Sequence, residues 1–276
     1  MTSPSSALGK VYLVGAGPGA ADLITVRGAK LLEKADIVFH DALVDTQMLE
    51  LCPQAEKIAV GKRCGKLSSA QHFINKRLVD AAKQYQVIIR LKGGDPMLFG
   101  RADEEIQALK NAGIEVEVVP GITAALAGAA SLQQSLTLRG ISRSVAFITL
   151  AQGTENITND QAIQPIANPS ADTLVYYMGR KDAARIAQQL IKQGSNQSAN
   201  TPVHILEAVS TPRERLWSST LGDLAQGKAN DWFDSSSPAL IMVGEALRDK
   251  NLEGASSKID DSLQDTQILA DSKRSA

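Results

Sequence analysis

Residues 90–101, RLKGGDPMLFGR, hold the residue types in this chain that are best suited to chemistry. A strand-like run ends in Gly93 and Gly94, which carry no side chain and let another molecule approach the backbone closely. Asp95 follows, and Pro96 keeps it extended rather than helical. A carboxylate at the carboxyl end of a parallel strand can hold a hydroxyl or amine group of a small ligand. Taken alone, the same residues could form a plain loop whose aspartate caps a helix.

A second glycine turn, VGAGPG at residues 14–19, matches the loose dinucleotide-binding pattern, with Asp41 after the next strand as the acid that would bind ribose. Two features count against this interpretation. Pro18 has no N–H to offer a pyrophosphate, and Asp41 lies farther along the chain than the usual spacing. An NAD-binding oxidoreductase therefore stays open as an alternative, and so does a tight turn with no ligand.

Composition narrows the function classes. The chain has 276 residues, of which 43 % are hydrophobic, enough for two α/β halves. A net charge of −1 and an aromatic content of 4 % argue against nucleic acid and membrane partners. Cys52 and Cys64 form no metal-binding pair, so we expect reduced thiols and no metal site. Without a signal peptide or a long apolar run, the protein is expected to be soluble and cytoplasmic.

Basic residues are frequent between Lys62 and Arg101, where acidic residues are few. The default interpretation of such a run, Arg90 and Lys92 included, is a set of solvated helix faces. The run would serve function only if several of its side chains met in a cleft that holds an acidic substrate.

Strand and helix patterns alternate along the first part of the chain, which predicts an α/β fold with a mainly parallel sheet. The expected strands there are residues 10–17, 36–41, 56–62, 86–95 and 114–121. The expected helices are residues 22–35 with Asp22 as N-cap, 68–84, and 102–113 ending at Gly113. The second part should contain helices 120–130 and 181–194, and strands 144–153, 172–179, 202–210 and 237–247. We therefore expect an N-terminal α/β domain at 10–119, a C-terminal α/β domain at 120–247, and a disordered tail at 248–276.

Six motifs occur in a fixed order, and their combination is specific although most are weak singly. They are VGAGPG (14–19), HDALV (40–44), VGKRCG (60–65), RLKGGDPMLFGRADEE (90–105), VVPGITAA (118–125) and VYYMG (175–179). Over residues 10–247 the chain strongly resembles the tetrapyrrole methylases, which use S-adenosylmethionine. The VGKR and LKGGDP-x-x-FGR blocks resemble those of the uroporphyrinogen-III C-methyltransferases. The resemblance implies two α/β domains with mixed, largely parallel sheets and a cofactor in the cleft between them.

The resemblance also implies roles for single residues. Asp41 matches the proton acceptor proposed for the family and Lys62 the donor, although a capping aspartate and a surface lysine are the plain alternatives. Candidates that would bind the substrate carboxylates, besides Lys62, are Arg27, Arg63, Arg101 and Arg139. Arg101 could instead pair with Glu104 or Glu105. The implied cofactor-contacting positions are Pro18, Gly93, Gly94, Asp95, Leu98, Thr123, Ala124, Met178, Val209 through its backbone, and Ala239 near the adenine.

The implied reaction is two successive methyl transfers from S-adenosylmethionine to uroporphyrinogen III. It gives precorrin-2 by way of precorrin-1, needs no metal, and would take place in a homodimer. The sequence has no dehydrogenase/ferrochelatase segment, so a stand-alone methyltransferase is expected. The sequence leaves open whether the product would feed sirohaem, haem d1 or cobalamin.

Two departures from the family pattern concern the substrate rather than the cofactor. Where GIPLTHR is common, residues 133–139 read QQSLTLR, and where TGH is common, residues 149–151 read TLA. Leu138 and Ala151 thus replace two expected histidines. A methyltransferase acting on another precorrin stays open for this reason. So do a relative that methylates ribosomal RNA or a diphthamide precursor, and a binding protein that keeps the cleft without catalysis.

Overall fold

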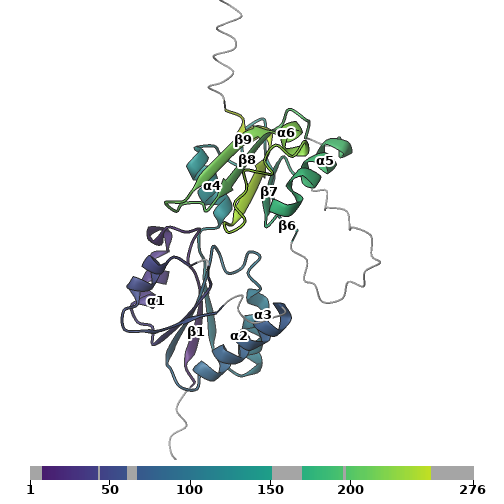
Figure 1. Cartoon of the computed structure of the whole chain (residues 1–276). Coiled ribbons are helices and arrows are strands. Elements are labelled where there is room, and N and C mark those ends of the chain that lie inside the picture. The colour runs from purple at the N-terminus through teal and green to yellow at the C-terminus, as the bar shows by residue number, and fades with distance from the viewer. Residues whose placement is uncertain (1–7, 43, 61–66, 151–169, 195–196, 250–276) are drawn as a thin grey trace, which may run out of the picture.

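The computed structural model describes residues 8–42, 44–60, 67–150, 170–194 and 197–249, which form two five-stranded sheets (Figure 1). The first sheet has the order β3-β2-β4-β1-β5, and all its pairings are parallel. Its half of the chain contains β1 (Lys10–Gly15), η1 (Ala21–Leu23), α1 (Val26–Leu32), β2 (Ile37–His40), η2 (Thr46–Leu51), β3 (Glu56–Ala59), α2 (Leu67–Ala81), β4 (Val87–Lys92), α3 (Ala102–Asn111) and β5 (Val116–Val119).

Both faces of this sheet are covered, as expected of parallel strands. Alternate residues of β1 serve opposite faces: Val11 and Leu13 pack in the cluster that contains α2 and α3, whereas Val14 packs in the cluster that contains α1 and η2. Figure 1 shows α2 and α3 together on one side of β1 and α1 on the other. The carboxyl ends of β1, β4 and β5 therefore meet at one edge of the sheet.

The second sheet has the order β6-β7-β10-β8-β9 and is mixed. β6 and β7 are parallel, and the other three pairings are antiparallel. Its elements are α4 (Ala124–Leu132), β6 (Val145–Thr149), β7 (Thr173–Tyr177), η3 (Arg180–Asp182), α5 (Ala183–Gln193), β8 (Pro202–Glu207), β9 (Arg215–Thr220), α6 (Leu221–Ala225), β10 (Ala239–Val243) and η4 (Glu245–Leu247). The predicted α/β class with two sheets is confirmed.

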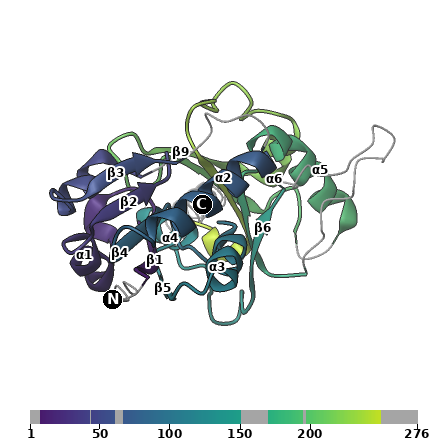
Figure 2. The same ribbon diagram turned by 90° about the horizontal axis from the view of Figure 1, so that it is seen from below.

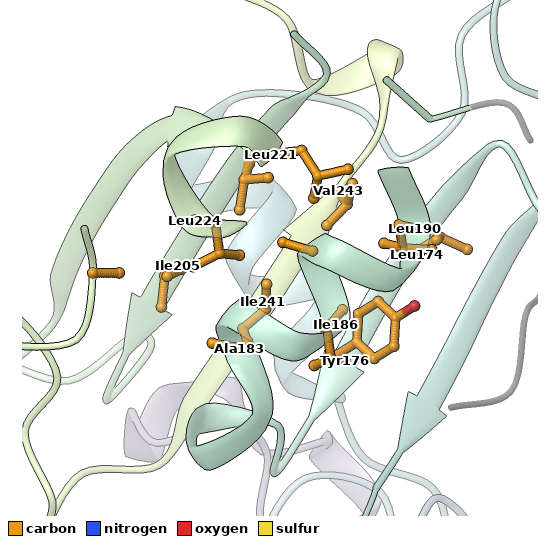
Figure 3. Packing of buried hydrophobic residues seen from close by; sticks show 13 residues of the cluster. Leu174, Tyr176, Ala183, Ile186, Leu190, Ile205, Leu221, Leu224, Ile241 and Val243 are labelled. Carbon is orange, nitrogen blue, oxygen red and sulfur yellow. The ribbon is translucent and has the colours of Figure 1, made fainter. Parts of the chain in front are cut away.

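Helices cover both faces of the second sheet as well. Ile186 of α5 and Leu224 of α6 pack with Tyr176 and Ile241 in a buried cluster on one face (Figure 3). On the other face, Ala125 and Ala127 of α4 pack against residues of β7, β8 and β10. Figure 2 shows α1, β2 and β3 at one end of the molecule and α5 and α6 at the opposite end.

The predicted start of the first helix is wrong. Asp22 lies in the short η1, and α1 begins after Thr25, whose hydroxyl accepts the N–H of Gly28 at 3.1 Å. Ile24 and Thr25 are extended, with ψ of 148° and 149°, so a helix cannot run through them. The prediction also missed β9 and α6.

Several predictions fall on residues outside the described ranges. They concern Lys62, Arg63, Cys64, Ala151 and nearly all of the tail, residues 250–276. Among the described residues, no helix is long and apolar enough to cross a membrane.

Candidate functional site

Three glycine-containing turns meet where β1, β4 and β5 end. A Cβ on Gly121 would lie 2.3 Å from the carbonyl oxygen of Gly94 and 2.8 Å from Cα of Gly15. Gly17 and Gly94 exchange two backbone hydrogen bonds, of 3.2 and 2.7 Å. The bare backbone at Gly15 and Gly121 is therefore required by other backbone, because a side chain at either position would push the turns apart.

The carboxylate of Asp95 joins two of these turns. One oxygen accepts the N–H of Met97 at 2.8 Å, and the other accepts the N–H of Gly121, also at 2.8 Å. Asp95 thus accepts backbone N–H groups, as the alternative interpretation of a plain loop with a capping aspartate predicted. Each carboxylate oxygen has a second lone pair, so binding of a ligand hydroxyl by Asp95 stays a prediction.

The ends of β7 and β8 face these turns from the second half of the chain. Tyr177 shares a 2.6 Å hydrogen bond with the hydroxyl of Thr123 and accepts the N–H of Ala125 at 3.1 Å. The tyrosine hydroxyl therefore caps α4, a role that Thr123 does not fill with its own side chain. Burial raises the pKa of Tyr177, against the effect of these hydrogen bonds.

Besides the contacts of Gly121, a ring contact and a hydrogen bond between described residues join the two halves around this site. The ring of Phe99, in the loop after β4, meets the ring of Tyr177 edge to face at 5.2 Å between centroids. The N–H of Ala20, in the turn after β1, donates to the hydroxyl of Ser210 at 3.1 Å. The loops that carry the predicted cofactor positions are thus brought together from both halves.

Backbone strain gathers in the same loops. Of the residues that the structure describes, six other than glycine have positive φ. One is Gln133, which ends α4, and five lie around the site, namely Phe99 (53°), Arg101 (53°), Met178 (56°), Ala208 (48°) and Ser210 (63°). Each such conformation costs free energy for an L-residue and is kept only where surrounding contacts enforce it. Because this strain is concentrated in loops facing one another, it supports a functional site there.

The remaining predicted cofactor positions differ in burial. Pro18, Leu98, Ala124 and Ala239 are half-buried, whereas the Met178 side chain is 54 % exposed. A methionine that follows a buried strand commonly packs in the core, but Met178 lies at the surface. Val209 is buried with Leu240, so its side chain packs in the core, and its carbonyl oxygen lies near Gly19.

Asp41, the expected proton acceptor, follows β2 and is half-buried. Its Oδ1 accepts a hydrogen bond from Nη2 of Arg90 at 2.5 Å. Arg90 also donates through Nε to Glu105, and Lys92 donates to both oxygens of Glu105, all at 3.1 Å. The buried amide of Gln71 completes this group by donating to Glu105 at 3.2 Å.

The default interpretation of Arg90 and Lys92 as solvated residues is wrong, because both are 2 % exposed. They lie in β4, within the predicted strand 86–95. Burial opposes the charge of Arg90, yet Asp41 and Glu105 raise the pKa of its guanidinium. Burial and the neighbouring Arg90 lower the pKa of Lys92. The signal was present in the sequence: residues 88, 90 and 92 share one face of a strand, so two cations there need buried acidic partners.

The predicted substrate-binding arginines are spread over several elements. Arg27 is 68 % exposed and lies 3.5 Å from Glu117 of the edge strand β5. Arg101 pairs with Glu104 through two hydrogen bonds, of 2.5 and 2.8 Å, whereas Glu105 belongs to the buried group. Arg139 is exposed in the turn between α4 and β6. Arg63 and the proposed donor Lys62 lie outside the described residues.

The turn after β1 is unsuited to a pyrophosphate. The N–H groups of Ala16, Gly17 and Ala20 already donate to Lys92, Gly94 and Ser210, and Pro18 has none. In a dinucleotide site the helix follows the glycine turn directly, with its N–H groups aimed at the phosphates. Here η1 and an extended segment separate the turn from α1, which argues against the NAD alternative.

Comparisons with known proteins agree with this geometry. The family model of the tetrapyrrole (corrin/porphyrin) methylases matches residues 10–225. The siroheme synthase of Pseudomonas fluorescens (strain SBW25) is 45 % identical over 262 residues, which cover 93 % of this chain and 55 % of that protein. The chain thus spans about half the length of such relatives.

Solved structures cover nearly the same region. The native uroporphyrin III C-methyl transferase of Thermus thermophilus is 34 % identical, with a TM-score of 0.72 over 88 % of this chain and 96 % of that one. The Thermus enzyme complexed with S-adenyl homocysteine is 36 % identical, with a TM-score of 0.71 over 87 % of this chain and 94 % of that one. A cobalt precorrin-4 methyltransferase is 27 % identical, with a TM-score of 0.70 over 90 % of this chain and 100 % of that one. This chain therefore belongs to the tetrapyrrole methylases.

Proposed function

We propose that this chain is a uroporphyrinogen-III C-methyltransferase, which transfers two methyl groups from S-adenosylmethionine and forms precorrin-2 by way of precorrin-1. Membership of the methylase family and the likeness to the Thermus enzyme support the acceptor. The observation that carries the proposal is the interlocked wall of Gly15, Gly94 and Gly121 facing Tyr177 and Ser210 across the two halves.

The residues at this wall fit S-adenosylmethionine. Within the described residues, a Cβ on Gly94 would meet nothing within 4 Å, so its backbone is open to close approach. Met97 and Met178 are exposed thioethers, which form adaptable apolar surfaces beside a flat base. Asp95 and Thr123 supply polar groups for the ribose or amino-acid part. The cofactor supplies an activated sulfonium methyl.

The chain's own task is largely one of orientation. The glycine wall and the facing loops of the second half would hold donor and acceptor so that the pyrrole carbon, the methyl group and the sulfur are in line. Reaction within such a complex replaces a bimolecular encounter. A C–C bond forms, the C–S bond breaks, and the ring system loses a proton. We assign acceptance of that proton to Asp41. Lys62 would donate a proton to the ring system as it rearranges, and the ring would release this proton again, so that each methyl transfer loses one proton overall. The assignment of Lys62 rests on the resemblance alone.

The acidic substrate needs cations at the rim of the site. Uroporphyrinogen carries a ring of carboxylates, and arginine binds such groups through two parallel hydrogen bonds. We keep Arg27, Arg63, Arg101 and Arg139 as candidates. Arg101 already holds Glu104 in this way, so a substrate carboxylate would have to share or displace that partner.

The test is anaerobic incubation of the purified chain with uroporphyrinogen III and isotope-labelled S-adenosylmethionine, followed by mass spectrometry. We expect mass shifts of one methyl group and then two. Asp41→Asn should bind S-adenosylhomocysteine like the wild type but turn over about 10²- to 10⁴-fold more slowly, the usual contribution of acid–base catalysis. A wild-type chain that binds the cofactor and leaves uroporphyrinogen III unmodified would refute the proposed acceptor.

A second acceptor class has specific support. The cobalt precorrin-4 methyltransferase matches over its full length, and Leu138 and Ala151 replace histidines common in the uroporphyrinogen enzymes. Precorrin substrates assayed beside uroporphyrinogen III distinguish these two candidates.

We also propose a cytoplasmic homodimer with a domain boundary between residues 119 and 120. The family resemblance supports the dimer, and the change of sheet between β5 and β6 supports the boundary. Light scattering should give twice the 29.3 kDa of one chain.

A further inference from the structure

We infer that Arg90 is the positioning residue that fixes the Asp41 carboxylate for proton transfer. The inference rests on the proposed function and adds a residue to which the resemblance gave no role. Arg90 lies in the centre of the first sheet, on β4, and its side chain is 3 % exposed. It reaches Asp41 at the end of the neighbouring strand β2, whose side chain is 30 % exposed. One partner thus faces the interior and the other solvent.

The guanidinium of Arg90 is held on every side that the structure describes. Nε donates to Glu105 at 3.1 Å, and Nη1 donates to the carbonyl groups of Leu91 at 3.1 Å and Phe39 at 3.4 Å. Glu105, fully buried on α3, also accepts from Lys92 and from Gln71 of α2. The planar group therefore has a fixed orientation, and Nη2 points to Asp41 from a rigid support.

This arrangement distinguishes the two oxygens of Asp41. Oδ1 accepts from Arg90, whereas Oδ2 accepts no hydrogen bond from the described residues. The structure thus leaves Oδ2 as the oxygen that can face the substrate. A carboxylate held through one oxygen loses little freedom when the proton is transferred, so its catalytic benefit is one of preorganisation.

The test is a double-mutant cycle with Arg90→Lys and Asp41→Asn, measured by anaerobic methyl transfer at saturating substrates. Lysine keeps the charge but cannot bind Asp41 and Glu105 together through a planar fork. We expect Arg90→Lys to lower kcat about 10²-fold, the cost of a displaced catalytic group. KM and the affinity for S-adenosylhomocysteine should stay within about threefold. In the Asp41→Asn background the same change should cost less than about threefold more, because interacting residues are not additive.

Lys92→Met is the matched control. Lys92 lies two residues along the same strand, is buried like Arg90 and donates to the same Glu105, yet within the described residues its ammonium makes no hydrogen bond to Asp41. This variant should lower the melting temperature while kcat stays within about threefold of wild type. If Arg90→Lys is too unstable to assay, Arg90→Gln with Glu105→Gln removes one charge of each sign and serves in its place.

The outcomes separate the inference from the proposed function. Wild-type kcat in Arg90→Lys, or an undiminished effect of Arg90→Lys in the Asp41→Asn background, would overturn the positioning role. Loss of kcat in Lys92→Met equal to that in Arg90→Lys would do the same, because it would indicate general damage to the buried group. A wild-type chain without methyl transfer would refute the proposed function, and the inference would fall with it. An Asp41→Asn variant with full activity would leave the function standing and would refute the proton-accepting role of Asp41, and with it the positioning role of Arg90.

Discussion

At the scale of single residues, the candidate site depends on glycines, which have no Cβ atom. Gly15 and Gly121 leave room for each other's backbone and for the carbonyl group of Gly94, and Asp95 joins two of the turns by accepting their N–H groups. The motif indicated a place of close approach. In the structure, backbone of the chain itself makes this close approach. The same packing leaves Gly94 open toward the second half.

Gly94 and Gly113 form a natural pair for testing this. Their φ values are 68° and 70°, and a Cβ on either would meet nothing within 4 Å among the described residues. Alanine should cost similar stability at both, about 1–2 kcal/mol, because the left-handed conformation is the same. Only Gly94→Ala should weaken S-adenosylhomocysteine binding, by more than about tenfold, measured by calorimetry. Equal affinities in the two variants would place the cofactor elsewhere.

At the scale of elements, the sequence predicted regular segments well and polar edges poorly. The α3 stop at Gly113 is confirmed by its φ of 70°, and the strands of the parallel sheet are found within a few residues. β9, with the sequence RLWSST, was missed because it is an edge strand with little buried apolar surface. α1 was placed too early because Asp22 and Thr25 are both good caps, and only tertiary contacts decide between them.

The site was predicted unevenly for a similar reason. Motif order identified the family and the loops around the proposed cofactor, because these are local features. The Arg90–Glu105 contact joins β4 to α3, and the Tyr177–Ala125 contact joins β7 to α4. Such partners depend on which helix covers which face of a sheet, and periodicity alone does not state this.

The capping of α4 by Tyr177 leads to a prediction about alkaline stability. Burial raises the pKa of Tyr177 above the ordinary value of 10.0. As pH rises above that value, the unfolded chain loses the phenolic proton while the folded chain keeps it, so the free energy of unfolding falls. The slope is about 1.4 kcal/mol per pH unit for each such tyrosine.

Tyr177→Phe should therefore make the fall in the free energy of unfolding with pH less steep, by the contribution of one tyrosine. Urea unfolding between about pH 10 and 11 measures this. Near neutral pH it should cost about 1 kcal/mol through the lost cap. Tyr176, whose pKa burial also raises, retains its own contribution. An unchanged slope would contradict the buried, protonated state of Tyr177.

At the scale of the whole molecule, the site is made by two halves that contribute matching loops. Phe99 with Tyr177, and Ala20 with Ser210, join them around the proposed cofactor. A ligand bound there contacts both halves and so should stabilise both.

The two tryptophans allow this to be measured. Trp217 and Trp232 both lie in the second half, so tryptophan fluorescence reports on that half, whereas circular dichroism reports on both. S-adenosylhomocysteine at about 100 times its dissociation constant should add about 2.7 kcal/mol of stability. We expect the melting temperatures followed by fluorescence and by circular dichroism to rise by the same number of degrees. A shift in fluorescence alone would show that the ligand binds the second half only.

The exposure of Met97 and Met178 has a consequence for the durability of the enzyme. Met48 and Met242 are fully buried, whereas Met97 and Met178 are 60 % and 54 % exposed on loops of the candidate site. Peroxide would therefore convert these two thioethers to polar sulfoxides first. Oxidative damage would begin at the candidate site while the interior stayed intact, and a protein that had lost its affinity for the proposed methyl donor could still look fully folded.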